Sequence, residues 1–158
     1  MKRLLFIIFI FLFPLNISYS SKLAAAELST GSTIFVPAYR SFYQIYGTTR
    51  DSYALTSTFF LYNIDPKLTI DIISIDFYDS SGKLLKNLID APILVKPRNS
   101  KEITIQPRTQ LDEDCASYLM IRWKSSQPAN TPIVEVLMVG QVMNRGISFS
   151  TRGCEVKE

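Results

Sequence analysis

The side chains that could do acid–base chemistry in this 158-residue chain are chiefly carboxylates, because the sequence contains no histidine. Without His there is no Ser-His or Cys-His nucleophile pair, no imidazole base and no His-ligated zinc. Three consecutive acids, Asp112, Glu113 and Asp114, could bind Ca²⁺ or act as acid and base in glycoside cleavage. One run supplies too few oxygens for calcium and does not fix the separation that cleavage needs, so a solvated loop is the favoured interpretation. We therefore predict no catalytic residue, no metal site and no cofactor.

Glu135 is the acid with the most unusual sequence context. In strict strand alternation it shares a face with the apolar Ile133 and Leu137, which predicts that its side chain points inward. A buried carboxylate needs a donor, and Arg152 or, as second choice, Arg122 lies in or at the end of another predicted strand. We expect a structural ion pair there; a functional pocket and a bulge that exposes Glu135 are the alternatives.

Aromatic side chains gather early in the domain, and Tyr39, Tyr43 and Tyr46 are its candidate binding residues. A tyrosine offers an apolar face and a polar tip, which suits stacking on a sugar or docking on a protein. The competing interpretation is that these rings, with Phe42 and Tyr53, pack along the edge of the domain.

Two cysteines, Cys115 and Cys154, follow the N-terminal leader. In an oxidising compartment such a pair is more often bridged than free, and closing a loop of this length stabilises by about 4 kcal/mol. We therefore predict a disulfide between them. The absence of Cys-x-x-Cys disfavours redox chemistry, and two buried free thiols are the other alternative.

The oxidising compartment is inferred from the first 26 residues. Lys2 and Arg3 precede an apolar run over residues 4–15, and small residues follow it. This order predicts a helical signal peptide over residues 1–26 that is removed on export. The run is shorter than the ~20 apolar residues that span a bilayer, although an uncleaved anchor is the alternative. We expect an exported protein, periplasmic or secreted, with no membrane segment after cleavage.

The leader also accounts for the positive charge of the chain. The 17 basic residues exceed the 14 acidic ones by three, and Lys2, Arg3 and Lys22 all lie within the first 26 residues. Because the remaining charges balance, no basic excess favours nucleic acid as a partner. The sequence predicts no particular oligomeric state.

Residues 27–158 have the length of one domain and the pattern of an all-β fold. β-rich runs alternate with turn signals, among them the hairpin turn Asp-Ser-Ser-Gly at 79–82, and Trp123 falls on the core face of its run. The runs are residues 33–39, 52–63, 68–78, 83–89, 93–96, 101–105, 115–124, 132–139 and 146–151. We predict an immunoglobulin-like β-sandwich of seven or eight antiparallel strands, with a small β-barrel as the alternative.

Several of these stretches, taken in order, resemble a bacterial protein family. They are residues 35–39 (FVPAY), 63–66 (NIDP), 77–84 (FYDSSGKL), 132–140 (PIVEVLMVG) and 146–153 (GISFSTRG). The chain is similar in them to the domain-of-unknown-function family 3124, most specifically in its C-terminal third. The resemblance implies a small exported bacterial protein and carries no activity with it.

Together these features predict a non-enzymatic binding module of the cell envelope, whose partner is an envelope protein or a polysaccharide. A carboxylate-dependent hydrolase of envelope polymers and a membrane-tethered accessory subunit are the alternatives. A cleft that holds two carboxylates would favour the hydrolase, and a retained leader would favour the subunit.

Overall fold

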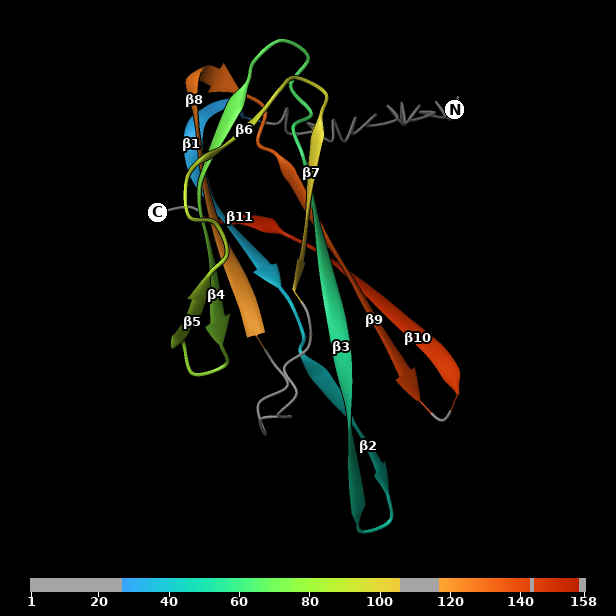
Figure 1. The fold of residues 1–158 in the computed structure, drawn as a ribbon. Coiled ribbons are helices and arrows are strands. Elements are labelled where there is room, and N and C mark those ends of the chain that lie inside the picture. The colour runs from blue at the N-terminus through green and yellow to red at the C-terminus, as the bar shows by residue number, and fades with distance from the viewer. Residues whose placement is uncertain (1–26, 106–116, 143, 157–158) are drawn as a thin grey trace, which may run out of the picture.

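The protein, analysed as a computed structural model, consists of two antiparallel β-sheets that face each other (Figure 1). The structure describes residues 27–105, 117–142 and 144–156. Within these ranges lie eleven strands and no helix. The predicted signal peptide, residues 1–26, lies outside the described residues. No helical segment of the described chain has the length and apolarity that a membrane crossing takes.

The first sheet has the strand order β11-β1-β8-β4-β5, with β6 paired to β4. Its strands are β1 (Ser29–Pro37), β4 (Ile70–Asp79), β5 (Leu84–Asn87), β6 (Ile93–Val95), β8 (Ser117–Ala129) and β11 (Cys154–Val156). The second sheet has the order β10-β9-β3-β2, with β7 paired to β3. Its strands are β2 (Ser41–Tyr46), β3 (Thr49–Tyr62), β7 (Ser100–Ile105), β9 (Ile133–Val142) and β10 (Arg145–Arg152).

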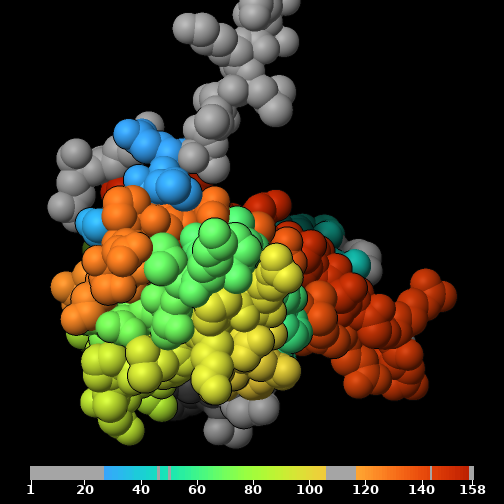
Figure 2. All heavy atoms as spheres, turned by 90° about the horizontal axis from the view of Figure 1, so that it is seen from above, coloured from blue at the N-terminus to red at the C-terminus, as the bar shows by residue number. Residues whose placement is uncertain are grey.

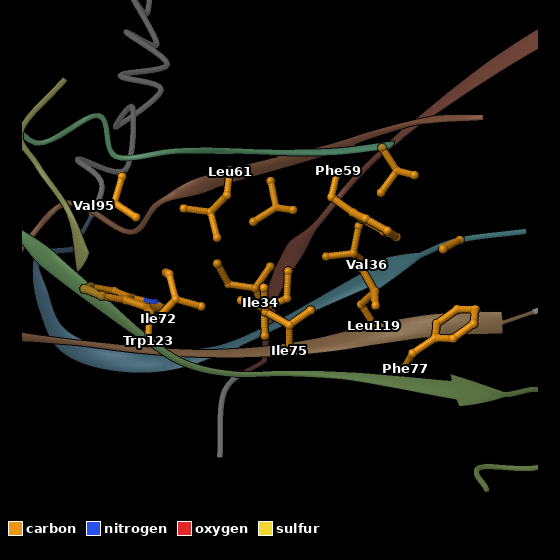
Figure 3. Packing of buried hydrophobic residues seen from close by; sticks show 14 of the residues in the cluster. Ile34, Val36, Phe59, Leu61, Ile72, Ile75, Phe77, Val95, Leu119 and Trp123 are labelled. Atoms are coloured by element: carbon orange, nitrogen blue, oxygen red, sulfur yellow. The ribbon is translucent and has the colours of Figure 1, made fainter. Parts of the chain in front are cut away.

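The core fills the space between the two sheets, as Figure 3 shows. Alternation decides which side chains enter it, because successive residues of a strand point to opposite faces. On β8 the buried positions include Leu119, Ile121 and Trp123, and on β9 they are Val134, Val136 and Met138. Trp123 is therefore a core residue, as predicted, and its indole Nε1 donates a hydrogen bond to Ser32 Oγ at 2.9 Å.

The chain passes between the sheets at points where two strands follow one another almost directly. One such point is Gly153, which separates β10 in the second sheet from β11 in the first. Its amide donates to the carbonyl of Val134 at 2.9 Å. A Cβ at this position would lie 2.7 Å from Ile34 Cγ2 and 2.9 Å from Val36 Cγ2. Glycine is required here because the backbone passes directly over the core.

The side chain of Asn63 holds together the loops at the β6–β7 end of the sandwich. Asn63 is fully buried, and its Nδ2 donates to the carbonyls of Leu68, Val95 and Lys96 at 2.8, 2.9 and 3.1 Å. Its Oδ1 accepts from the amide of Asp65 at 3.0 Å. The Asn-Ile-Asp-Pro stretch is thus more than a turn, since it joins three segments of the chain.

The all-β sandwich is confirmed: the two antiparallel sheets are curled and together form a sandwich-like or half-barrel arrangement (Figure 1). The Asp79 hairpin is also confirmed: Gly82 has a φ of 82°, and Asp79 Oδ1 accepts from the amides of Ser81 and Lys83. The described residues form eleven strands rather than seven or eight. β2 and β11 were not predicted, because β2 is aromatic without clear alternation and β11 has three residues.

Candidate binding groove

The candidate site lies between β2 and β10, where the chain segment formed by β1 and β2 separates from the segment formed by β10 and β11. β1 leads into β2, and β10 leads into β11. β1 and β11 are hydrogen-bonded, with Phe35 opposite Cys154. Further along, Thr151 Oγ1 donates to the carbonyl of Pro37 at 2.6 Å. The two segments are thus joined at one end, while β2 and β10 belong to opposite edges of the second sheet.

Two aromatic rings, one from β2 and one from β10, are in contact near the point where these strands separate. The rings of Phe42 and Phe149 meet edge to face with centroids 5.9 Å apart, and Phe42 also stacks on Tyr53 at 5.3 Å. Between β2 and β10 lies a groove of about 630 Å³. We call it the seam groove; it is lined by Phe42, Tyr43, Gln44, Val142, Arg145, Ile147 and Phe149.

The walls of the seam groove suit a mostly apolar ligand. Aromatic and aliphatic side chains supply five of the lining residues, and Gln44 and Arg145 supply polar groups. Its volume falls within the several hundred Å³ typical of ligand sites. Phe149 is 45% exposed although it is large and apolar, so part of the wall is open to solvent. Arg145 adds a positive charge, which favours a ligand that carries an acidic or carbonyl group at that position.

The structure separates the three predicted binding tyrosines. Tyr43 lines the seam groove. Tyr39 lies at the bend between β1 and β2, where it is 41% exposed and its carbonyl accepts from Ser57 Oγ. The backbone of Tyr46 belongs to β2, but its side chain is not among those the structure describes. The predicted aromatic region thus contributes Phe42 and Tyr43 to the site.

The prediction that Glu135 points inward is wrong. Its side chain is exposed, and Val134, Val136 and Met138 of the same strand are the buried ones. Alternation does not show which face of β9 is buried, because both of its faces carry apolar residues. Arg152 does stand directly opposite Glu135 across β10 and β9, yet no ion pair joins them among the described contacts.

Arg122, the second proposed partner of Glu135, belongs to the other sheet and has different partners. Its Nε donates to Ser74 Oγ at 2.8 Å, and its Nη2 lies 3.4 Å from Asp76 Oδ2. Asn87 donates to the other oxygen of Asp76 at 2.9 Å. This cluster lies on the outer face of the first sheet and satisfies the mostly buried carboxylate of Asp76.

The outer face of the first sheet also carries a row of aromatic rings. Tyr78 and Tyr118 stack with centroids 5.2 Å apart and planes 10° apart, and Phe35 meets Tyr118 at 5.2 Å. Tyr78 and Tyr118 are close and nearly parallel, so these two rings cover each other's faces and do not offer them to a sugar. The row stabilises the pairing of β1, β8 and β4.

Asp65 is the described acid with the most strongly perturbed protonation. Backbone hydrogen bonds from Lys67 and Leu68 and from the amide of Asn130 lower its pKa from 3.8 to about 2. The pKa of Asp79 is also lowered, by hydrogen bonds to its carboxylate from the Ser81 hydroxyl and from the amide of Lys83. Both carboxylates hold turns, and neither lines the groove.

Other predicted features lie outside the described residues. Asp112, Glu113, Asp114 and Cys115 belong to that group. Cys154 is exposed on β11. Because Cys115 is not described, the disulfide between the two stays a prediction. Within the described ranges, no group of three or more acidic or cysteine side chains could hold a metal ion.

Sequence reasoning missed the C-terminal half of the site. Ile147 and Phe149 alternate with serines, which predicted a strand, but nothing local connects them with Phe42 about 100 residues earlier. Their meeting depends on the curl of the second sheet. Only the aromatic enrichment near Tyr43 indicated a surface with a role in binding.

Comparison with known proteins bears on the family and not on a ligand. No curated protein matches the chain. Among solved structures, the crystal structure of Thermotoga maritima 1070 is similar, with 13% identity and a TM-score of 0.45 over 78% of this chain and 92% of that one. A family model, described as a protein of unknown function, DUF3124, matches residues 31–156. The chain therefore belongs to the DUF3124 family.

Proposed function

We propose that this protein is an exported binding module of the cell envelope, which holds its partner in the seam groove. The observation that carries the proposal is an apolar groove of about 630 Å³ whose wall includes the partly exposed Phe149 and Tyr43. Exposed aromatic side chains beside a concavity are typical of binding surfaces. Export is supported by the charge and apolar pattern of residues 1–26.

The hydrolase alternative would need two carboxylates across a cleft. The seven residues that line the seam groove include neither Asp nor Glu. Elsewhere in the described chain, Asp65 and Asp76 have their oxygens engaged by hydrogen bonds from neighbouring residues. These observations favour binding over hydrolysis as the role of this groove.

Titration with the fluorescent dye 8-anilinonaphthalene-1-sulfonate tests the groove, because the dye combines apolar rings with an anionic group. We expect saturable binding at one site, weakened at least fivefold in Phe149→Ser. The matched control is Val139→Ser on the outer face of β9, which removes an apolar side chain of almost the same exposure, 46% against 45%. The control variant is expected to bind the dye like the parent protein.

Two results would refute the proposed site. One is the absence of saturable dye binding to the folded parent protein. The other is an equal loss of binding in Phe149→Ser and Val139→Ser, because the dye would then detect apolar surface in general. Far-ultraviolet circular dichroism of both variants verifies that each retains the β fold.

A further inference from the structure

β10, which forms one wall of the seam groove, is the last strand at one edge of the second sheet in the described chain. β10 is hydrogen-bonded to β9 from Arg145 opposite Val142 to Arg152 opposite Glu135, without a register shift. No strand of the described chain pairs with its other edge. The backbone N–H and C=O groups that point away from β9 can therefore accept another strand.

β10 has few of the features that usually protect such an edge, because its two charged residues, Arg145 and Arg152, stand at its ends. Proteins shorten their edge strands, or place proline, inward charges or bulges in them. With eight residues, β10 is the longest of the described edge strands; β5 has four residues and β11 has three. Between Arg145 and Arg152 it contains neither a charge nor a proline. The hairpin that it forms with β9 also stands out from the body of the protein (Figure 2).

The residue pairing between β1 and β11 can be extended along the chain toward β2 and β10, which line the seam groove. β1 and β11 pair antiparallel, with Phe35 opposite Cys154 and Ile34 opposite Glu155. Counting the same register onward along both strand pairs places Phe42 opposite Ile147 and Gln44 opposite Arg145. All four of these residues line the seam groove. The groove therefore occupies the place where the ladder that begins at β1 and β11 would continue.

We propose that the partner is a protein and that it contributes an extended segment, which adds to the free edge of β10 as an antiparallel strand. The inference rests on the proposed function of the seam groove and specifies its ligand. Every second side chain of the guest strand would lie among Phe42, Ile147 and Phe149, so these positions require apolar residues. The intervening side chains would face away from the groove and can be polar.

The geometry limits the length of the guest strand. The hydroxyl of Thr151 holds the end of β10 against Pro37, so the open part of the edge comprises residues 145–149. Five residues of strand extend over about 17 Å. The recognised segment is thus about five residues long, with backbone hydrogen bonds supplying affinity and alternate side chains supplying specificity.

A synthetic peptide with the sequence of residues 41–46 (SFYQIY) followed by two lysines tests the inference. The continued register places this sequence opposite β10. We expect the peptide to bind the full mature chain and to shift the amide resonances of residues 145–149 in ¹⁵N spectra. Two further peptides carry backbone N-methyl groups on alternate residues, one in each of the two frames.

Strand addition predicts that the two methylated peptides behave differently. Alternate residues of a guest strand direct their N–H groups toward the edge that they join. Methylation in that frame should weaken binding at least tenfold, while methylation in the other frame should change it less than threefold. Because the protein is unchanged throughout, misfolding of a variant cannot produce this result.

The remaining outcomes separate the two proposals. If both methylated peptides bind like the parent peptide or weaken equally, side chains alone hold the ligand and strand addition is wrong. Failure of the parent peptide to bind at about 1 mM, while the dye binds and Phe149→Ser weakens it, also refutes strand addition but leaves the groove as a site. Failure of both peptide and dye refutes the proposed function as well.

Discussion

Replacing Asn63 by alanine tests the loop-holding role of the Asn-Ile-Asp-Pro stretch. Asn63 is 1% exposed and makes four hydrogen bonds, three as donor and one as acceptor. The carbonyl of Leu68 and the amide of Asp65 have no other hydrogen bond among the described contacts, so both lose their partners in Asn63→Ala. The carbonyls of Val95 and Lys96 lose one of their interactions.

The expected effect is large for a single substitution. Each buried polar group left without a partner costs about 1–3 kcal/mol. With two such groups, the free energy of unfolding in Asn63→Ala should fall by about 4 kcal/mol, out of the 5–15 kcal/mol typical of a domain. Urea denaturation measures the change as a lower midpoint at unchanged slope.

Asn87→Ala is the matched control, because the same side chain is removed from an exposed position on β5. Asn87 donates one hydrogen bond to Asp76 and accepts one from the amide of Ile89. We expect this variant to lose about 1 kcal/mol, since water can replace the exposed partner. If Asn63→Ala is no more destabilising than Asn87→Ala, the role assigned to Asn63 is wrong.

Three further predictions concern single positions. The pKa of Asp65 in the folded state, about 2, is below its usual 3.8. The ionised carboxylate therefore stabilises the fold fully above about pH 4, and this contribution is lost as the pH falls toward 2. The unfolding midpoint of Asp65→Asn should depend less on pH in this range than that of the parent protein. Gly153→Ala places a Cβ 2.7 Å from Ile34 Cγ2 and should destabilise by about 1–3 kcal/mol, and a calorimetric melting temperature equal to that of the parent would contradict this. Glu135→Gln removes the charge of an exposed side chain that forms no ion pair with another described residue, and it should change stability by less than about 0.5 kcal/mol; a marked loss in thermal melts would mean that Glu135 is paired after all.

The contrast between β8 and β9 shows what the sequence can predict about this fold. On β8, Leu119, Ile121 and Trp123 alternate with Tyr118, Met120 and Arg122, and the charged Arg122 indicates which face is exposed. On β9, every residue from 133 to 139 except Glu135 is apolar, so alternation does not define the inner face. A shift of one residue moves all side chains to the other face, which is how Glu135 was placed inside.

The seam groove could be predicted only in part, for a different reason. Enrichment in aromatic residues indicated the region around Tyr43 as a candidate surface. The opposite wall, with Ile147 and Phe149, comes close only because β3 and β9 pair in the middle of a curled sheet and bring its two edges together. Local patterns do not encode this curvature, since it results from strand twist summed over the whole sheet.

Site-specific photo-crosslinking in cells that express the full chain tests the central claim most directly. A photoreactive phenylalanine analogue replaces Phe149 in the seam groove or, as the control, Val139 on the outer face, two positions of nearly equal exposure. We predict a crosslinked product of higher mass from position 149, none from position 139, and loss of that product when the Ser41–Tyr46 peptide is added to permeabilised cells. No product from position 149, or equal products from both positions, would contradict the assignment of the seam groove as the binding site.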